Sequence, residues 1–428
     1  MAKKILRLIS YFCFFSILFL LLIIFLVDKN FLNYKDKLYL EYPNLKIARY
    51  VFSKKKNINY NLNNDYNVQF LPLTQFEKIE ILKKKINFKE EYFVNKDKFQ
   101  DTISYKRYGS FFFDFYKDDL VLSDYLGNFY LKKDFSKFFL ESKKNEFNIV
   151  KNNLKPIRIF DILIEEKKIY VSYTLRENNC TSIRVSYAEI NYDFLDFKDF
   201  FKPEICSDTG SPGRIKLFKF NNKKGLLLST SDGEADKPSP NAQNKNSIFG
   251  KILFLPLDNT PHQIFSLGHR VIQGLEVDNN IIISTEHGPR GGDEINKIEF
   301  EANYGWPISS YGERYDFKYK NTNIDYLKSH KIHKFSEPVF SFIPSVGISE
   351  IIKLPKNFSI FYDDHYVLST LNDRSIYFLR LDVANNKLLS LEKVFIGQRI
   401  RDISYYNKKN FIVLALEESS EIAILFKN

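Results

Sequence analysis

The sequence predicts an all-β fold, a propeller of repeated four-stranded blades, preceded by one N-terminal transmembrane helix. Three observations carry this prediction. Short apolar runs that alternate with a period of two recur along most of the chain, separated by polar turns. No long stretch shows a convincing amphipathic helical repeat, and a single uncharged apolar stretch lies near the N-terminus.

The apolar stretch at residues 8–27 follows Lys3, Lys4 and Arg7. About 20 such residues suffice to cross a bilayer as a helix. The stretch ends without the small residues of a signal-peptide cleavage site, so we predict that residues 1–30 form an uncleaved anchor, with a cleaved signal peptide or a buried helix of a soluble protein as the alternatives. Basic residues before the span favour a cytoplasmic N-terminus. The rest of the chain would then face the periplasm of a bacterium, tethered to the inner membrane.

Residues 31–66 are rich in Asn, Lys and Tyr without a sustained period and are predicted to be a connector, and residues 67–428 to be the propeller. Phe76–Lys85 is the one candidate helix in this part. The predicted strands are Gly109–Tyr116, Leu120–Leu126, Ile169–Thr174, Ile183–Tyr187, Gly225–Thr230, Lys251–Leu257, Ile281–Thr285, Tyr366–Leu371, Ile376–Leu381 and Phe411–Leu416. So many strands exceed one sandwich, and a closed ring of blades leaves few free edges. Two successive β-sandwiches are the alternative.

The net charge of +11 is spread along the chain, with lysines interleaved among Asp and Glu. A nucleic-acid site would need these charges gathered into one basic surface, so no nucleic-acid partner is expected. Cys13 lies in the predicted span. Cys180 and Cys206 would share an exported compartment in which a disulfide persists, but the sequence leaves open whether they pair.

Residues 286–307 are the most informative stretch, because they and the next few residues contain five of the 16 glycines and the only tryptophan, Trp306. Clustered glycines indicate unusual backbone torsions or close approach of the backbone to another group. Turns of this kind expose carbonyl oxygens, and the adjacent Asp293 and Glu294 add anionic oxygens. Calcium binds about six to eight such oxygens. A glycine turn with two solvated acids is the alternative.

This stretch, followed by Ser-Ser-Tyr-Gly at 309–312, closely resembles the glucose/sorbosone dehydrogenase family. That family includes soluble glucose and aldose sugar dehydrogenases, six-bladed propellers that use pyrroloquinoline quinone (PQQ) and calcium. Weaker matches occur in the family's order at Gly213-Arg214-Ile215, Ala242-Gln243, Gly250-Lys251-Ile252-Leu253, Gly268-His269-Arg270, Gln273-Gly274-Leu275, Pro344-Ser345 and Arg399-Ile400-Arg401-Asp402-Ile403. The resemblance implies six blades and an oxidoreductase that oxidises an aldose or related polyol and passes electrons to a membrane or periplasmic acceptor.

The resemblance also implies site residues. The positions that hold calcium beside the cofactor in the family are Gly288, Pro289, Glu294 and Tyr304 here. The positions that bind the anionic quinone are Arg270, Ser345, Arg399 and Arg401. Arginine suits the second task because its planar guanidinium pairs with carboxylates through two hydrogen bonds.

Three departures from the family pattern weigh on catalysis. The family's general base is a histidine four residues before the arginine that is Arg214 here, and that position holds Gly210, which cannot accept a proton. Asp208 in the same loop is the candidate substitute. Val271 replaces a family asparagine, and Asn372 replaces a cofactor-binding lysine, with Arg374 nearby as a possible substitute.

The remaining aromatic and histidine residues of these motifs are interpreted as structural. His269 and His287 are expected to be packed or hydrogen-bonded, and Trp306 to be a core residue beneath the turn. The missing base leaves an alternative function, in which the chain is a catalytically inactive family member that binds a ligand or partner at the same place.

Overall fold

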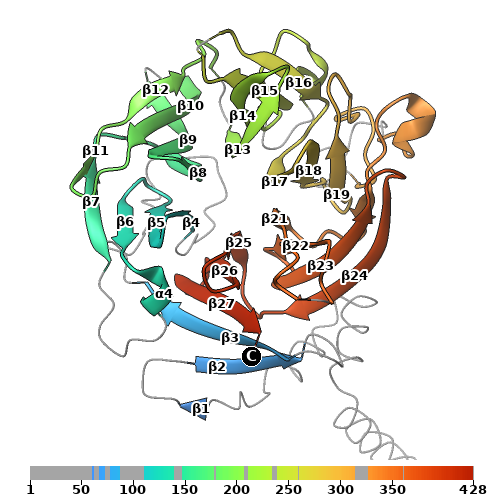
Figure 1. Cartoon of the computed structure of the whole chain (residues 1–428). Coiled ribbons are helices and arrows are strands. Elements are labelled where there is room, and N and C mark those ends of the chain that lie inside the picture. The colour runs from blue at the N-terminus through green and yellow to red at the C-terminus, as the bar shows by residue number, and fades with distance from the viewer. Residues whose placement is uncertain are drawn as a thin grey trace, which may run out of the picture. The chain divides into compact units, whose positions relative to one another are not determined.

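The computed structural model describes residues 60–61, 67–72, 78–86, 110–138, 147–177, 180–206, 211–233, 239–258, 260–313, 326–359 and 361–427. Their strands form six sheets, arranged around a common axis as the blades of a propeller (Figure 1). The predicted six-bladed all-β propeller is confirmed, and the alternative of two sandwiches is wrong.

The blades are numbered here along the chain. Blade 1 contains β4 (Phe111–Tyr116), β5 (Asp119–Asp124), β6 (Phe129–Lys132) and β7 (Asn148–Asn152), with β11 (Phe194–Leu195) added at its outer edge and the short helix α4 (Phe135–Phe138) after β6. Blade 2 contains β8 (Arg158–Glu165), β9 (Lys168–Glu177), β10 (Cys180–Glu189) and β12 (Lys198–Phe201). Blade 3 contains β13 (Pro212–Phe220), β14 (Lys223–Thr230), β15 (Lys251–Pro256) and β16 (Gln263–Leu267), with the 3-10 helix η2 (Pro240–Gln243) before β15.

The second half of the ring follows the same plan. Blade 4 contains β17 (Ile272–Asp278), β18 (Ile281–Glu286), β19 (Asp293–Ile298) and β20 (Phe340–Phe342), with the 3-10 helix η3 (His330–His333) before β20. Blade 5 contains β21 (Ile348–Lys353), β22 (His365–Thr370), β23 (Ser375–Asp382) and β24 (Lys387–Phe395). Blade 6 contains β25 (Ile400–Tyr406), β26 (Phe411–Leu416) and β27 (Glu421–Lys427), and then β3 (Lys78–Lys85), β2 (Asn67–Pro72) and β1 (Tyr60–Asn61).

The ring is closed by a strand from the N-terminal part of the chain. β3 pairs antiparallel with β27, with Ile81 opposite Leu425, so blade 6 joins segments from both ends of the sequence (Figure 1). The predicted helix at Phe76–Lys85 is therefore wrong over its described part. Pairing with β27 prevails over local propensity because it places Ile81 in the core toward blade 5 and Leu82 against the core toward blade 1.

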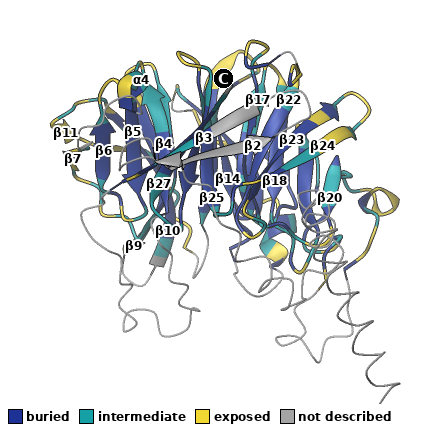
Figure 2. Ribbon diagram, turned by 90° about the horizontal axis from the view of Figure 1, so that it is seen from below, coloured by how far each residue is buried: buried dark blue, intermediate teal, exposed yellow. Residues whose placement is uncertain are grey.

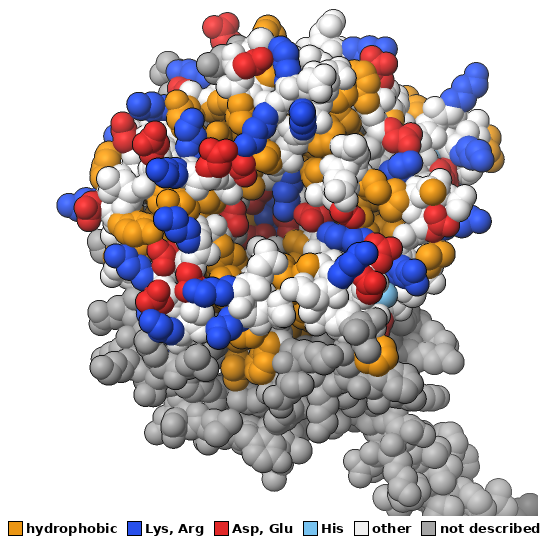
Figure 3. Space-filling model, in the orientation of Figure 1, with side chains coloured by type: hydrophobic (Ala, Val, Ile, Leu, Met, Phe, Trp, Pro, Cys, Tyr) orange, Lys and Arg blue, Asp and Glu red, His pale blue; other side chains and the backbone are white. Residues whose placement is uncertain are grey.

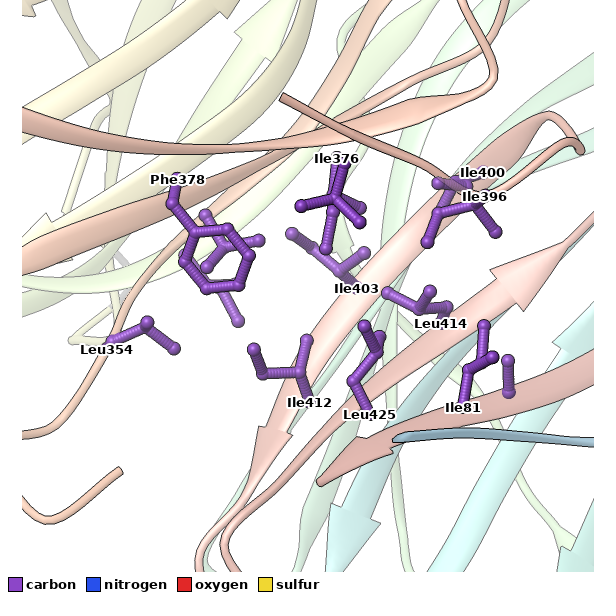
Figure 4. Close-up of a cluster of buried hydrophobic side chains, with 14 of the residues drawn as sticks. Ile81, Leu354, Ile376, Phe378, Ile396, Ile400, Ile403, Ile412, Leu414 and Leu425 are labelled. Atoms are coloured by element: carbon purple, nitrogen blue, oxygen red, sulfur yellow. The ribbon is translucent and has the colours of Figure 1, made fainter. Parts of the chain in front are cut away.

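The hydrophobic core lies between neighbouring blades. Among the described residues, six large clusters of buried side chains each join the strands of two adjacent sheets. Figure 4 shows the cluster between blades 5 and 6, in which Phe378 and Ile376 face Ile403, Ile412 and Leu414. Buried positions fill the strands, and exposed positions concentrate at the turns (Figure 2). Burial of apolar side chains on both faces of each blade thus holds the ring together.

The axis of the propeller is occupied by charged side chains from the innermost strands. The Arg214 guanidinium contacts three carboxylates from three other blades, 3.1 Å from Asp161, 2.8 Å from Glu350 and 2.9 Å from Asp402. All four side chains are nearly buried. The ladders of these strands carry irregularities at the same level, for example between Ile159 and Asp161 in β8. Such bulges redirect side chains, here toward the axis.

Two of these carboxylates also accept backbone amides of the next blade. Asp402 of blade 6 accepts from Phe113 of blade 1, and Asp161 of blade 2 accepts from Ile215 of blade 3, at 3.1 and 2.8 Å. The innermost strands are thereby fixed relative to one another, and the loops at their starts with them. On the face shown in Figure 3, basic and acidic side chains are mixed around the central hollow and over the surface, without a region of one sign.

The membrane-related predictions fall largely on residues that the structure does not describe. The anchor at residues 1–30 and all of the connector except β1, which pairs with β2, lie outside the described residues. In the part of the chain that is described, no helix is both long enough and apolar enough to span a bilayer. Cys206 takes part in a disulfide bond, while the side chain of Cys180 lies outside the described part of the chain, so the pairing of these two cysteines stays a prediction.

Candidate cofactor site

A pocket opens at one end of blade 4, close to the start of β17, and we call this end the mouth of blade 4. Its walls come from the β18–β19 turn and from the segments around Trp306 and His330. The lining residues are Arg270, Glu286, His287, Gly288, Pro289, Gly292, Glu294, Tyr304, Trp306, Ser309, Ser310 and His330. Five of the eight residues assigned to calcium and cofactor by resemblance are therefore together in one pocket.

The glycines of the motif allow two loops to pack backbone against backbone. A Cβ on Gly288 would lie 2.2 Å from the carbonyl oxygen of Gly291, and one on Gly312 would lie 2.4 Å from the same oxygen. Gly292 has a positive φ of 70°. Arg290 and Glu313 exchange main-chain hydrogen bonds of 3.0 and 2.8 Å between the loops. The close approach predicted from the glycine cluster is confirmed, and it presents the Gly288–Pro289 segment to the pocket.

The two acidic residues of the motif have different roles. Asp293 is buried and accepts the main-chain amides of Gly288 at 3.1 Å, Gly347 at 2.8 Å and Ile348 at 3.1 Å. It therefore ties the turn to the start of blade 5. Glu294 points into the pocket, because side chains alternate between the two faces of a strand.

Glu294 lies directly opposite Glu286 in the β18–β19 ladder, so two buried carboxylates are cross-strand neighbours. Burial raises the pKa of Glu294, and the charge of Glu286 raises it further, against the opposing effect of His330. Its oxygens contact His330 Nε2 at 3.2 Å and, more weakly, Asn296 Nδ2 at 3.4 Å. Like charges at paired positions are unfavourable, so this pair calls for a proton or a cation.

Glu286 and His330 were not predicted from the sequence. Glu286 accepts the main-chain amide of Arg270 and contacts His269 Nδ1 at 3.0 Å. His330 stands in η3, and its Nδ1 is buried without a hydrogen-bond partner. Burial alone would lower the pKa of His330, but Glu294 raises it above its ordinary value. Glu286 could have been found from the sequence as the residue that pairs with Glu294 when the two strands are aligned as a hairpin. No sequence pattern indicates His330.

Tyr304 lines the pocket, and its hydroxyl is engaged by main-chain groups. The hydroxyl donates to the Lys297 carbonyl at 2.6 Å and accepts from the Glu299 amide at 3.0 Å. The ring stacks on His269 with 4.6 Å between centroids. Since the hydroxyl is already engaged, the main-chain carbonyl is the remaining oxygen of Tyr304 for a cation.

Arg270 is the cationic side chain of the pocket. Its Nη1 donates to the carbonyls of His287 and Gly288 at 3.1 and 3.0 Å. The guanidinium lies over Trp306, 5.4 Å from the ring centroid. Trp306 itself is buried and donates from Nε1 to Asp232 at 2.7 Å, which confirms its interpretation as a core residue, although it also lines the pocket.

Arg399, Arg401 and Ser345 are not among the lining residues of this pocket. The two arginines flank the start of β25 and both contact Glu417, which follows β26. Ser345 precedes β21, and its Oγ is buried without a hydrogen-bond partner. The cofactor residues predicted by resemblance therefore divide between the pocket of blade 4, which Arg270 lines, the start of blade 5, which Ser345 precedes, and the start of β25 with Arg399 and Arg401, which we call the mouth of blade 6.

The departures from the family pattern are only partly visible. Asp208 and Gly210 lie outside the described residues. Arg374, the possible substitute for the family's lysine, pairs at the surface with Glu418 at 2.7 Å, so its guanidinium already has a partner within the protein.

His269 and His287 have the structural roles predicted for them. His269 is fully buried between Ser266 and Glu286, and His287 Nε2 contacts the Ile348 carbonyl at 2.6 Å.

Comparison with known proteins places the chain. The sequence model of the glucose/sorbosone dehydrogenase family matches residues 159–424. An uncharacterized protein of Synechocystis is 28% identical over 292 residues, which are 61% of this chain and 68% of that protein. The aldose sugar dehydrogenase YliI of Escherichia coli is 25% identical over 281 residues, 60% of this chain and 72% of that protein.

Solved structures agree at the level of the fold. The apo form of the soluble aldose sugar dehydrogenase of E. coli superposes with a TM-score of 0.60 at 19% identity, covering 75% of this chain and 96% of that one. The PQQ-bound aldose sugar dehydrogenase of Streptomyces coelicolor gives a TM-score of 0.53 at 16% identity, covering 72% and 91%. Since the family match spans more than half of the sequence, this propeller belongs to the glucose/sorbosone dehydrogenase family.

Proposed function

We propose that this protein is a PQQ- and calcium-dependent oxidoreductase that acts on an aldose or a related polyol. The observation that carries the proposal is one pocket that combines a buried carboxylate pair, Glu286 and Glu294, with the Gly288–Pro289 turn and Arg270. The family supports the reaction class, and relatives include an aldose sugar dehydrogenase and a PQQ-bound one.

The donor set fits calcium. Glu294 supplies a carboxylate, and Gly288, Pro289 and Tyr304 can supply carbonyl oxygens, which are the ligands that this cation prefers. A cation would also compensate the cross-strand carboxylates, since burial raises the pKa of Glu294 and the charge of Glu286 raises it further. The ring nitrogen of His330 holds one Glu294 oxygen at 3.2 Å, so calcium would share that carboxylate or displace the histidine.

The cationic residues fit an anionic quinone. Arg270 faces the pocket from blade 4, and Arg399 and Arg401 stand at the mouth of blade 6. The buried Oγ of Ser345 has no partner and could donate to a ligand oxygen. When bound, PQQ supplies the electron-accepting centre of the oxidation.

The protein's own part in the reaction is to bind, orient and exclude water. Arg270 is braced by two carbonyls and by Trp306, so its position is set before a ligand arrives, and a preorganised charge acts with little reorganisation. The proton of the substrate hydroxyl needs an acceptor, and Asp208 remains the candidate for this role.

The test is a titration of the full chain, solubilised in detergent and loaded with calcium, with PQQ. Quinone absorbance is followed before and after addition of a panel of aldoses and polyols. The proposal expects binding that is lost on calcium removal by a chelator, and quinone reduction that depends on sugar. Asp208→Asn then tests the base and should lower kcat with little change in PQQ binding. Absence of any PQQ binding would overturn the proposal.

A second function is favoured by one specific observation. The family's base position holds Gly210, so the chain could be a catalytically silent member that binds a ligand at this mouth. The same titration distinguishes the two functions. A catalytically inactive member would bind PQQ, but no sugar of the panel would reduce the bound quinone.

The cellular location is part of the same proposal. We expect residues 1–30 to anchor the propeller on the periplasmic side of the inner membrane, near a membrane or periplasmic electron acceptor. The disulfide at Cys206 supports an oxidising compartment. Protease treatment of spheroplasts checks this: the propeller should be cleaved from outside, and protection would contradict the orientation.

A further inference from the structure

One carboxylate joins the two arginines at the mouth of blade 6. Glu417 accepts Arg399 Nε on Oε1 at 2.5 Å and Arg401 Nε on Oε2 at 2.8 Å. Ser110, which precedes β4 of blade 1, donates its hydroxyl to Oε2 at 2.8 Å. Both oxygens of Glu417 are thus engaged by side chains that a carboxylate ligand at this mouth would otherwise meet.

Glu417 is held in place independently of the arginine side chains. Its main-chain amide donates to the Arg399 carbonyl at 3.0 Å, and the residue is 5% exposed. Burial alone would raise the pKa of Glu417, but the two arginines outweigh it and lower the pKa to about 2. The carboxylate is therefore ionised and fixed at any pH at which the protein works.

The cluster adjoins the pocket of blade 4. Arg401 Nη1 donates to Gln273 Oε1 at 3.3 Å, and Gln273 lies on β17, close after Arg270. A ligand that spans from Arg270 toward the axis therefore meets the Arg399–Arg401 pair.

The formal charge at this mouth is smaller than the arginines suggest. Arg399 and Arg401 contribute two positive charges and Glu417 removes one, while the Arg399 side chain stays 36% exposed. By contrast, the Arg270 guanidinium donates to neutral carbonyls and keeps its full charge for a ligand.

We propose that Glu417 is a built-in counter-ion of the arginine pair, and that it limits the affinity of this mouth for carboxylate ligands by occupying the Nε edges of both guanidiniums. This inference rests on the proposed function, in which the pair faces the carboxylates of PQQ. Removing the carboxylate leaves two adjacent cations without compensation, and an incoming dicarboxylate restores it. Loss of Glu417 should therefore destabilise the ligand-free protein and strengthen carboxylate binding together.

The experiment uses benzene-1,3-dicarboxylate as a planar probe, titrated calorimetrically into the detergent-solubilised full chain. Glu417→Gln keeps the side-chain shape and removes the charge, and we expect it to bind the probe about tenfold more tightly than the wild type. Its melting temperature should be lower without the probe and should recover more at saturation. Glu418→Gln is the matched control, since it removes the same charge one residue away and should leave probe affinity within about twofold.

Equal or weaker probe binding by Glu417→Gln overturns the inference and makes Glu417 a structural brace. If that variant does not fold, Arg399→Gln/Glu417→Gln has the same net charge as the wild type and is compared with Arg399→Gln alone. The double variant should bind the probe at least fivefold more tightly, and equal affinities overturn the inference. Because the probe is not PQQ, the result for Glu417 does not depend on whether the wild type binds PQQ, and the two proposals can fail independently.

Discussion

The axis and the pocket of blade 4 both contain buried charge, and they differ in how that charge is compensated. On the axis, Arg214 is surrounded by Asp161, Glu350 and Asp402, and these carboxylates also accept main-chain amides of innermost strands. In the pocket, the Glu294 carboxylate contacts His330 Nε2 at 3.2 Å and the side-chain amide of Asn296 at 3.4 Å. The other ring nitrogen of His330, Nδ1, is buried without a hydrogen-bond partner.

This difference separates a structural charge cluster from a ligand-ready one. The axial groups satisfy one another and join the blades, so a ligand there would have to break existing contacts. The pocket groups are incompletely satisfied, which costs the apo protein stability and leaves interaction energy for a bound cation or anion. The following predictions test whether the two regions respond to mutation as this distinction requires.

The largest effect is expected at Arg214. Arg214→Met leaves three buried carboxylates without their shared cation, and breaking a buried pair in this way costs about 3–5 kcal/mol. The free energy of unfolding from denaturant titration should fall by that amount or the variant should fail to fold. Lys224→Met, which removes a cation from an exposed pair with Glu165, is the control. A loss below about 1 kcal/mol at Arg214 would contradict the structural role of the axis.

The next effect is the pH dependence that Glu350 gives the axis. Burial raises its pKa to about 7, although Arg214 opposes the shift. The folded state then holds a proton that the unfolded chain releases near pH 4.5, so this contribution to stability is complete in acid and is lost as the pH rises through about 7.

Comparison with Glu350→Gln isolates this group. Between pH 5.5 and pH 8.5, the free energy of unfolding of the wild type should fall by about 2 kcal/mol relative to that of the variant. Denaturant titrations at both pH values measure the difference. Parallel pH profiles would mean that Glu350 is ionised throughout and that Arg214 compensates it fully.

How far the fold could be predicted from sequence differs between the middle strands of the blades and the innermost strands. Every predicted strand overlaps a strand of the structure, and most of these are middle strands of blades, buried on both faces. The innermost strands β8, β13, β17, β21 and β25 were missed because bulges and axial charges such as Arg214 and Glu350 interrupt their apolar alternation. β3 was mistaken for a helix because its partner, β27, lies at the other end of the chain.

The site shows the same limit. The Gly288–Pro289 turn, Glu294 and Arg270 were predicted because they occur within contiguous family motifs. His330 and Glu417 were not, because each acts on a motif residue from a distant segment, and single-residue partners of that kind leave no pattern in one sequence.

A moderate effect is expected for calcium at Glu294. If the pocket is ligand-ready, calcium should raise the melting temperature of the wild type, because a ligand that binds the folded state stabilises it. Glu294→Gln should weaken calcium binding at least tenfold, equivalent to about 1.4 kcal/mol. Glu299→Gln removes an exposed charge from the same blade and should keep the calcium response. An unchanged response in Glu294→Gln would move the cation away from this pocket.

The smallest effect is expected at Arg374, which sharpens the assignment of the anion-binding residues. Its pair with Glu418 is solvent-exposed, and such pairs contribute about 0–1 kcal/mol, so Arg374→Gln should barely alter the free energy of unfolding. If Glu418 is its proper partner, PQQ affinity measured by quinone absorbance should also stay within about twofold, whereas Arg270→Gln should lower it at least tenfold. A tenfold loss in Arg374→Gln would show instead that this arginine leaves Glu418 and replaces the family's lysine.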